Sequence, residues 1–170
     1  MDSAKAVRKG EALDWDKLAI YLRANLPELT GEMTVGQFHG GHANLTYLLK
    51  FGATELVMRR PPFGKIAPGA HDMKREYRVL SKIYNHFSPA PRAYHLCEEE
   101  TIIGAKFVVI ERRTGVIVRY ELLDCFKGFE NAEERLTDAM IRAQANLHAI
   151  DYEAADLSRL GRPAGFLERQ

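Results

Sequence analysis

The chain has 170 residues, which is the length of one domain or of part of a larger one and is enough to bury a core. Its 24 lysines and arginines nearly balance its 23 aspartates and glutamates, so the net charge of +1 gives no electrostatic reason to expect a nucleic-acid or membrane partner. No stretch approaches the roughly 18 consecutive apolar residues of a membrane span. The composition therefore favours a small or neutral ligand.

The cysteine content and the first residues bear on the cellular compartment. Cys97 and Cys125 are the only cysteines, and they lack the CxxC spacing of a metal or redox site. Residues 1–10 are charged and carry no apolar run of the kind that a signal peptide contains. These features predict a reduced, cytoplasmic protein.

The first predicted element is a short leading helix. Asp14 can cap this helix, and Pro27 ends its pattern. The apolar positions that recur at helical spacing are Trp15, Leu18, Leu22 and Leu26.

Three runs with strand character follow, at residues 33–38, 44–50 and 55–60. Glycine-bearing turns join them, first at Gly40-Gly41 and then at Gly52. Sequential short strands of this kind predict an antiparallel meander.

A helix and two further strands are predicted next. Residues 61–70, PPFGKIAPGA, form a loop because their prolines and glycines disfavour regular structure. A helix is predicted over residues 71–84 from the spacing of its apolar residues, which are Met73, Tyr77, Leu80 and Ile83. Strands are predicted at 93–97 and 105–111, with the acidic residues EEE in the turn between them. The expected count is five strands with one inserted helix.

Beyond Gly115 the pattern becomes that of a long helix. One apolar stripe has offsets of 0, 3, 4, 7, 11 and 14 and comprises Leu136, Ala139, Met140, Ala143, Leu147 and Ile150. Such a stripe needs a partner surface. Residues 151–170 show little periodicity and are predicted to form a loop, and a domain boundary is predicted near 112–116.

This order of elements resembles the amino-terminal lobe of the protein-kinase-like fold, in the aminoglycoside phosphotransferase and choline kinase branch. Three stretches carry a narrower resemblance to kinase-like domains related to those attached to certain acyl-CoA dehydrogenases: RRPPFGKIAPGAHDMKREYRVL, LHAID and GRPAGFLERQ. The resemblance covers nearly the whole chain, and its motifs are more specific together than singly.

The resemblance implies an α+β fold with three parts. A leading helix within residues 1–30 precedes a nucleotide-binding lobe at 31–113, whose five-stranded antiparallel sheet carries one inserted helix. Residues 114–170 are then the start of a helical carboxy-terminal lobe, which begins with the striped helix and is cut short.

The turn FHGGHAN is a candidate cover for phosphate. Glycine backbone lets N–H groups approach an anion without a side-chain clash, and the resemblance makes Gly40, Gly41, His42 and Asn44 candidate nucleotide-binding residues. A plain hairpin turn is the alternative. His42 stands where related kinases often carry a small polar residue, and the chain lacks the full GxGxxG of protein kinases.

Arg59 stands where the resembled fold usually has its phosphate-binding cation, at the end of the third strand. Period-2 alternation places Val57 and Arg59 on one sheet face and Leu56 and Met58 on the other. A guanidinium suits phosphate oxygens because of its planar fork of donors. The alternative is a solvated arginine at a strand end, and this is the interpretation favoured for Arg60.

Glu76 lies on the apolar edge of its predicted helix, where a charge is costly unless it is paired. The resemblance implies a pair between Glu76 and Arg59. A surface pair with Lys74, Arg75 or Lys82 is the alternative.

Adenine is expected to lie against the segment VVIERR. The candidate hinge contacts are backbone groups at Ile110, Glu111 and Arg112, so the identity of these side chains says little.

Two motifs could be mistaken for catalytic elements. His71-Asp72 could indicate a metal-dependent phosphohydrolase, but that chemistry needs further His and Asp ligands, and capping of the helix by Asp72 is the preferred interpretation. His148 and Asp151 could suggest a kinase catalytic loop. They match a structural LHxxD element of the resembled family instead, so His148 is predicted to be buried or to cap its helix.

The resemblance also implies a reaction. Phosphoryl transfer needs an aspartate that orients the acceptor hydroxyl and side chains that hold Mg²⁺. In the resembled family these lie beyond GRPAGFLERQ, so we assign no catalytic residue and no metal ligand to this chain. The expected function is the ATP-binding part of a small-molecule kinase that transfers the γ-phosphate of ATP, with Mg²⁺, to a hydroxyl of a small metabolite or hydroxyacyl compound.

Two other classes stay open at this stage. The chain could be a non-catalytic nucleotide-binding or regulatory module derived from the kinase fold. It could also be a structural piece that self-associates through the helix Leu136 to Ile150.

Overall fold

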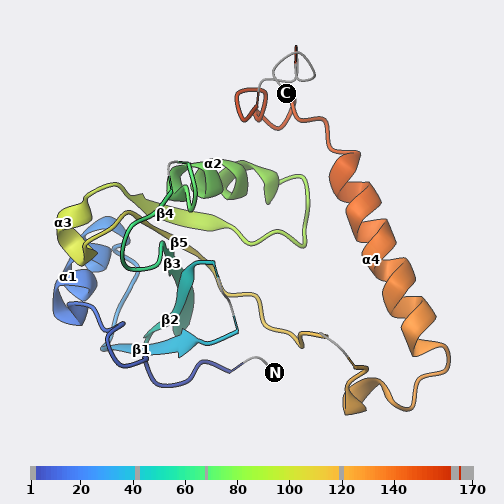
Figure 1. Ribbon diagram of the computed structural model, residues 1–170, viewed down its shortest axis with the longest axis horizontal. Helices are drawn as coiled ribbons and strands as arrows, with labels where there is room; N and C mark the ends of the chain where they lie inside the picture. The colour runs from blue at the N-terminus through green and yellow to red at the C-terminus, as the bar shows by residue number, and fades with distance from the viewer. Residues whose placement is uncertain (1–2, 41–42, 68, 119–120, 162–164, 166–170) are drawn as a thin grey trace.

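The computed structural model describes residues 3–40, 43–67, 69–118, 121–161 and 165. They form a five-stranded antiparallel sheet in the order β1-β2-β3-β5-β4, with helices around it (Figure 1). Within these residues no helix is both long and apolar enough to cross a membrane.

The elements agree closely with the predicted ones. The strands are β1 (Met33–Phe38), β2 (Leu45–Phe51), β3 (Thr54–Arg60), β4 (Ala93–Cys97) and β5 (Phe107–Glu111). The helices are α1 (Trp15–Asn25), α2 (Met73–Ile83), α3 (Glu100–Ile103) and α4 (Ala132–His148), with a 3-10 turn η1 (Asp124–Phe126) before α4. The predicted α+β fold with five antiparallel strands is confirmed.

Both predicted helix caps are present. The Asp14 carboxylate accepts the backbone N–H of Lys17 at 3.0 Å, and the Asp72 carboxylate accepts that of Arg75 at 3.0 Å. Each bond satisfies a donor that the first turn of a helix leaves unpaired. Asp72 is therefore a helix cap, as preferred in the sequence analysis.

The acidic stretch after β4 was wrongly predicted to be only a turn. Its last glutamate begins α3, a single helical turn that Gly104 ends with a left-handed φ of 76°. Glutamate is favourable in a first helical turn, and glycine is favourable just after a helix. The pattern was missed because four residues are too few to show periodicity.

The two faces of the sheet carry different helices. Leu56 and Met58 point into the larger core beneath α1 and α3, whereas Val57 points into a smaller core against α2. Figure 1 shows α2 along one side of the sheet and α1 beside α3. The period-2 prediction for β3 is confirmed.

Arg60 is buried, so its predicted exposure is wrong. Its side chain is 2% exposed on the face that α1 and α3 cover, and it donates to the carbonyls of Pro61 at 3.0 Å and Ile103 at 3.2 Å. The guanidinium also lies 4.1 Å from the centre of the Phe63 ring. Burial lowers the pKa of Arg60. Its position at a strand end suggested solvent, but α3 covers this end of β3.

The chain leaves the sheet after Glu111, and Figure 1 shows α4 set apart from the sheet. The boundary predicted near 112–116 lies in this connection and stays a prediction. The described part of the tail, 151–161, contains turns only. There the Asp151 carboxylate accepts the N–H groups of Glu153 at 2.9 Å and Ala154 at 3.0 Å, which fits a structural LHxxD element.

His148 was predicted to be buried or to cap its helix. It is the last residue of α4 and is exposed, so burial is wrong, and a capping role stays a prediction. A basic side chain in the last helical turn interacts favourably with the negative end of the helix dipole. The position at the helix end is therefore favourable without burial.

Candidate nucleotide-binding site

The candidate site lies on the sheet face that Val57 and Arg59 share. In the register of the strands, Leu48 of β2 and Ile110 of β5 stand on either side of Val57, and Thr46 stands beside Arg59. Side chains directly opposite in an antiparallel pair share a face. On this face, the row of apolar side chains Leu48, Val57 and Ile110 therefore lies next to the positively charged Arg59.

Arg59 and Glu76 form an ion pair, as predicted. Their side-chain nitrogen and oxygen lie 2.8 Å apart, with side chains that are 33% and 17% exposed. The helix α2 brings the carboxylate over the end of β3 because its buried Met73 anchors the first turn against this face. Arg59 is therefore not a solvated strand-end arginine.

The alternative partners of Glu76 are engaged elsewhere. Lys74 pairs with Glu98 at 2.7 Å, Arg75 with the capping Asp72 at 3.7 Å, and Lys82 with Asp156. These pairs leave Arg59 as the cation that neutralises the half-buried carboxylate.

The environment of Glu76 opposes its charge. Burial raises the pKa of Glu76, and the positive charge of Arg59 counteracts this effect. Among the residues that the structure describes, no group forms an aligned hydrogen bond with the Oε1 atom that lies 2.8 Å from Arg59. The pair therefore rests on charge attraction more than on directional hydrogen bonding.

A cavity of about 380 Å³ opens beside this pair. The first turn of α2 and the loop before it line the cavity, with Arg59, Gly69, His71, Asp72, Arg75, Glu76, Val79 and Leu80. The amino-terminal end of a helix carries partial positive charge, and three basic side chains also face this space. The cavity therefore combines cationic groups with two carboxylates.

Asn44 is tied to the same cavity. The amide oxygen of Asn44 lies 2.6 Å from Nδ1 of His71, so the start of β2 is joined to the loop before α2. Gly40 lies at the bend after β1, whereas Gly41 and His42 lie outside the described residues. His71 had no predicted role at this site, because its motif with Asp72 pointed to other chemistry. In the described part of the chain, no three His, Cys, Asp or Glu side chains are grouped so that they could hold a metal ion.

The side chains of Glu111 and Arg112 in the candidate hinge bind other residues of the chain. The backbone N–H of Glu111 donates to the Arg92 carbonyl at 2.8 Å, and the Glu111 carboxylate accepts the Arg92 N–H at 3.0 Å. Arg112 pairs with Glu55, which also binds Lys50 at 2.7 Å. Contacts to adenine from Ile110, Glu111 or Arg112 would come from backbone atoms, and they stay a prediction.

A second cavity, of about 370 Å³, lies on the same face near the hinge. Strands β1 and β2 contribute Thr34, Val35, Gly36, Leu48 and Lys50, Arg112 follows β5, and residues 3–6 form another wall. Residues 3–6 had no predicted role in a binding site. Gly36 was the available signal, because glycine inside a strand often marks a close approach of other backbone. A Cβ at Gly36 would lie 2.8 Å from the Cβ of Ala4.

Comparison with known proteins identifies the family to which this fold belongs. The model of the phosphotransferase enzyme family matches residues 34–170, which is most of the chain. The chain belongs to this family.

Relatives and a solved structure of the phosphotransferase family extend the comparison. The chain is 32% identical over 170 residues to mouse acyl-CoA dehydrogenase family member 10 and 29% identical over 162 residues to human acyl-CoA dehydrogenase family member 11. These alignments cover 99% and 92% of the chain but 16% and 20% of the relatives. The narrower resemblance seen in the sequence is confirmed.

A crystal structure from Ralstonia eutropha JMP134, assigned as an aminoglycoside phosphotransferase, superposes with a TM-score of 0.72 at 30% identity. The superposition covers 93% of this chain and 45% of that one. The chain thus spans about a fifth of the curated relatives and just under half of the solved phosphotransferase.

The burial of Glu76 leads to a prediction about stability and pH. In the unfolded chain this carboxyl titrates near its ordinary pKa of 4.5, and in the folded chain it titrates higher. Between these two values the folded state binds more protons, so stability falls as the pH rises through the window. Glutamine does not titrate, and Glu76→Gln is therefore expected to remove this part of the slope.

Urea unfolding between about pH 4 and pH 7 measures this slope. Glu98→Gln is the control, because Lys74 lowers the pKa of the Glu98 carboxyl and so gives a contribution of opposite sign. The same slope in wild type and Glu76→Gln would contradict the proposed environment of Glu76.

Proposed function

We propose that this chain is the ATP-binding part of a small-molecule kinase, which transfers the γ-phosphate of ATP to a hydroxyl group. The observation that carries the proposal is the Arg59–Glu76 pair, 2.8 Å apart, beside the cavity at the start of α2. In phosphotransferases of the kinase fold, a cation on this strand paired with a glutamate of this helix orients the phosphates of ATP. Arginine can do so because a guanidinium has five donors and one carboxylate does not use them all.

The face also offers a place for the nucleoside. Leu48 and Val57 are buried apolar residues that stand opposite each other in neighbouring strands, and Leu48 also lines the second cavity. We call this pair the apolar wall. A purine ring would bury apolar area against this wall while its polar edge faced the backbone near Ile110. The triphosphate would then extend toward Arg59.

Transfer of phosphate in this family uses Mg²⁺, which neutralises the charge that develops on the phosphates. We assign no residue of this chain to Mg²⁺. What the chain itself contributes is the orientation of the phosphates by Arg59 and the apolar wall for the base.

The names of the relatives point to two classes of acceptor. The names of the matching relatives, acyl-CoA dehydrogenase family members 10 and 11, favour a hydroxyacyl compound. The name of the solved relative favours an aminoglycoside. Both classes carry hydroxyl groups, so the reaction type is common to them.

A reducing, cytoplasmic compartment completes the proposal. Cys97 is buried and Cys125 is exposed, and both are free thiols in the structure. Thiols persist in reducing compartments, which supports this location.

Calorimetric titration with ATP tests the proposed function. Wild-type chain is expected to bind ATP weakly, and Arg59→Ala is expected to weaken binding by about tenfold or more, because a charge-assisted bond to phosphate contributes about 1.5–3 kcal/mol. Arg142→Ala is the matched control, since it removes an arginine from an exposed ion pair with Asp138 on α4. Equal affinities of wild type and Arg59→Ala would refute the assignment.

A further inference from the structure

Residues 3–11 form a strap along the outer edge of β1. The backbone N–H of Lys5 donates to the Gln37 carbonyl at 2.9 Å, and the N–H of Gln37 donates to the Lys5 carbonyl at 2.8 Å. β1 is the first strand of the sheet, so this edge would otherwise present unpaired backbone groups. We call residues 3–11 the amino-terminal strap.

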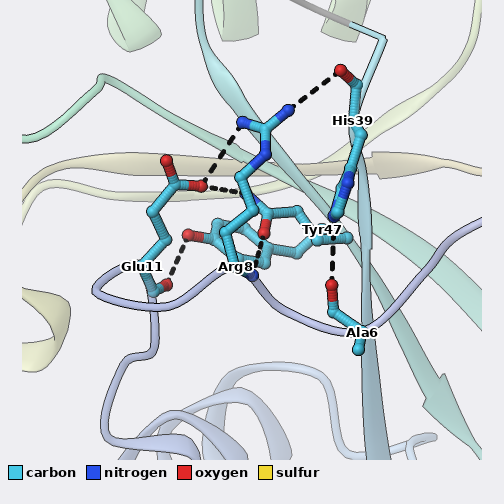
Figure 2. A network of polar contacts seen from close by, with 6 residues as sticks. Ala6, Arg8, Glu11, His39 and Tyr47 are labelled. Carbon is cyan, nitrogen blue, oxygen red and sulfur yellow. Dashed lines mark hydrogen bonds and ion pairs between the residues drawn. The ribbon is translucent and has the colours of Figure 1, made fainter.

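Side chains reinforce the strap (Figure 2). The backbone N–H of Arg8 donates to the side-chain oxygen of Gln37 at 2.8 Å, and the Gln37 amide group donates to Glu11. The hydroxyl of Tyr47 donates to the Glu11 carbonyl at 2.8 Å. Gln37 and Tyr47 are both completely buried, so their polar groups depend on the strap for partners.

The strap also holds the residue that leads into the glycine turn. The Arg8 guanidinium donates to the His39 carbonyl at 2.9 Å, and the ring nitrogen Nε2 of His39 lies 3.0 Å from the Ala6 carbonyl. Figure 2 shows the Arg8 guanidinium between Glu11 and His39, with an ion pair of 3.6 Å on the Glu11 side. His39 directly precedes Gly40. The strap therefore holds both the main chain and the imidazole ring of His39.

The first residues of the strap reach the sheet face of the candidate site. Residues 3–6 line the cavity of about 370 Å³ together with Leu48, Lys50 and Arg112. Ala4 packs on Gly36, whose missing side chain makes room for it. The strap thus contacts both the β1–β2 hairpin and the cavity beside Leu48, which we call the nucleoside end of the site.

We propose that the amino-terminal strap positions the β1–β2 hairpin for nucleotide and closes the nucleoside end of the site. Arg8 and His39 are positioning residues, which fix the base of the glycine turn without contacting the ligand themselves. This inference rests on the proposed function, because the ligand that the hairpin would cover is ATP.

The energetic reason is pre-organisation. Fixing the backbone of one residue costs about 1–2 kcal/mol, and glycine loses more conformational freedom than any other residue when it is fixed. If the strap meets this cost during folding, nucleotide binding does not have to meet it again. Loosening the strap should therefore lower affinity even though no contact with the ligand is lost.

The test compares Arg8→Ala and His39→Ala with wild type in two measurements. ATP affinity by calorimetry is expected to fall about three- to tenfold, which corresponds to the loss of one or two hydrogen bonds. Amide hydrogen exchange at residues 36–40 is expected to accelerate, and added ATP should protect these amides less than in wild type. His39→Gln retains a side-chain donor for the Ala6 carbonyl and is expected to recover part of the affinity.

Lys17→Ala is the matched control. It removes a similar bond from a side chain to a backbone carbonyl, 2.8 Å long, between α1 and Thr101 at the end of the sheet away from the hairpin. It is expected to change neither ATP affinity nor exchange at 36–40.

The outcomes separate the two proposals. If wild type binds ATP and both strap variants bind it equally well, the strap has no positioning role and the proposed function stands. Lower affinity in Lys17→Ala to the same extent as in the strap variants would also overturn the inference, because the effect would then be general loss of stability. If wild type binds no ATP, the proposed function and the role of the strap both fail.

Discussion

Replacing Arg60 with alanine is expected to lower the free energy of unfolding by about 2–3 kcal/mol. The substitution removes a guanidinium that is 2% exposed and leaves the Ile103 carbonyl without this donor. It also leaves a void beside Phe63, over which the guanidinium lies. The cost of burying the charge, seen in the lowered pKa of Arg60, opposes these losses and keeps the expected effect below that of a fully paired buried ion.

Two further variants locate the source of this effect. Arg60→Met keeps most of the volume and removes only the charge and its hydrogen bonds, so it is expected to lose less stability than Arg60→Ala. Arg23→Ala is the matched control, because Arg23 also donates to a carbonyl and lies over an aromatic ring, but it is exposed. Urea unfolding measures all three. If Arg60→Ala unfolds at the same urea concentration as Arg23→Ala, burial of Arg60 is not important for the fold.

The contrast between Arg59 and Arg60 shows what the sequence could predict at this site. Alternation along β3 separates the two side chains onto opposite faces, and the helical spacing of α2 places Glu76 on the apolar edge of its helix. Both patterns are local, but they do not name the partner of Glu76. The pair with Arg59 was implied by the resemblance to the kinase-like fold. Whether an arginine at a strand end is exposed to water depends on which element covers it. Arg60 is covered by α3, which comes about 40 residues later in the chain.

The strap could not be predicted for the same reason, because its position depends on residues far from it in the chain. Residues 3–11 have no periodicity of their own, and they are ordered by the edge of β1 and by the buried polar groups of Gln37 and Tyr47. Gly36 within β1 was the one sequence feature that indicated close packing of another segment on this strand. Pairing between distant segments cannot be predicted from the sequence of one segment. The strands and the helix caps could be predicted, because their patterns are local.

The apolar stripe of α4 is accessible in the structure. Met140 is 66% exposed and Leu147 is 38% exposed, and Figure 1 shows the helix set apart from the sheet. Five of the six stripe residues, Leu136, Met140, Ala143, Leu147 and Ile150, are separated by 4, 3, 4 and 3 positions, and Ile150 follows the end of α4. This spacing is that of a coiled-coil seam, which packs on an equivalent seam.

We propose that a second copy of the chain covers this stripe. Contiguous exposed apolar surface is costly in water, and a seam with heptad spacing is complementary to itself when two copies pair across a two-fold axis. Light scattering is therefore expected to give about twice the chain mass of 19.3 kDa. Met140→Glu places a charge in the seam and is expected to give the single-chain mass. Ala145→Glu adds the same charge on the opposite side of α4 and is expected to leave the dimer intact. A single-chain mass for wild type at every concentration would contradict this proposal, and so would equal dissociation by the two glutamate substitutions.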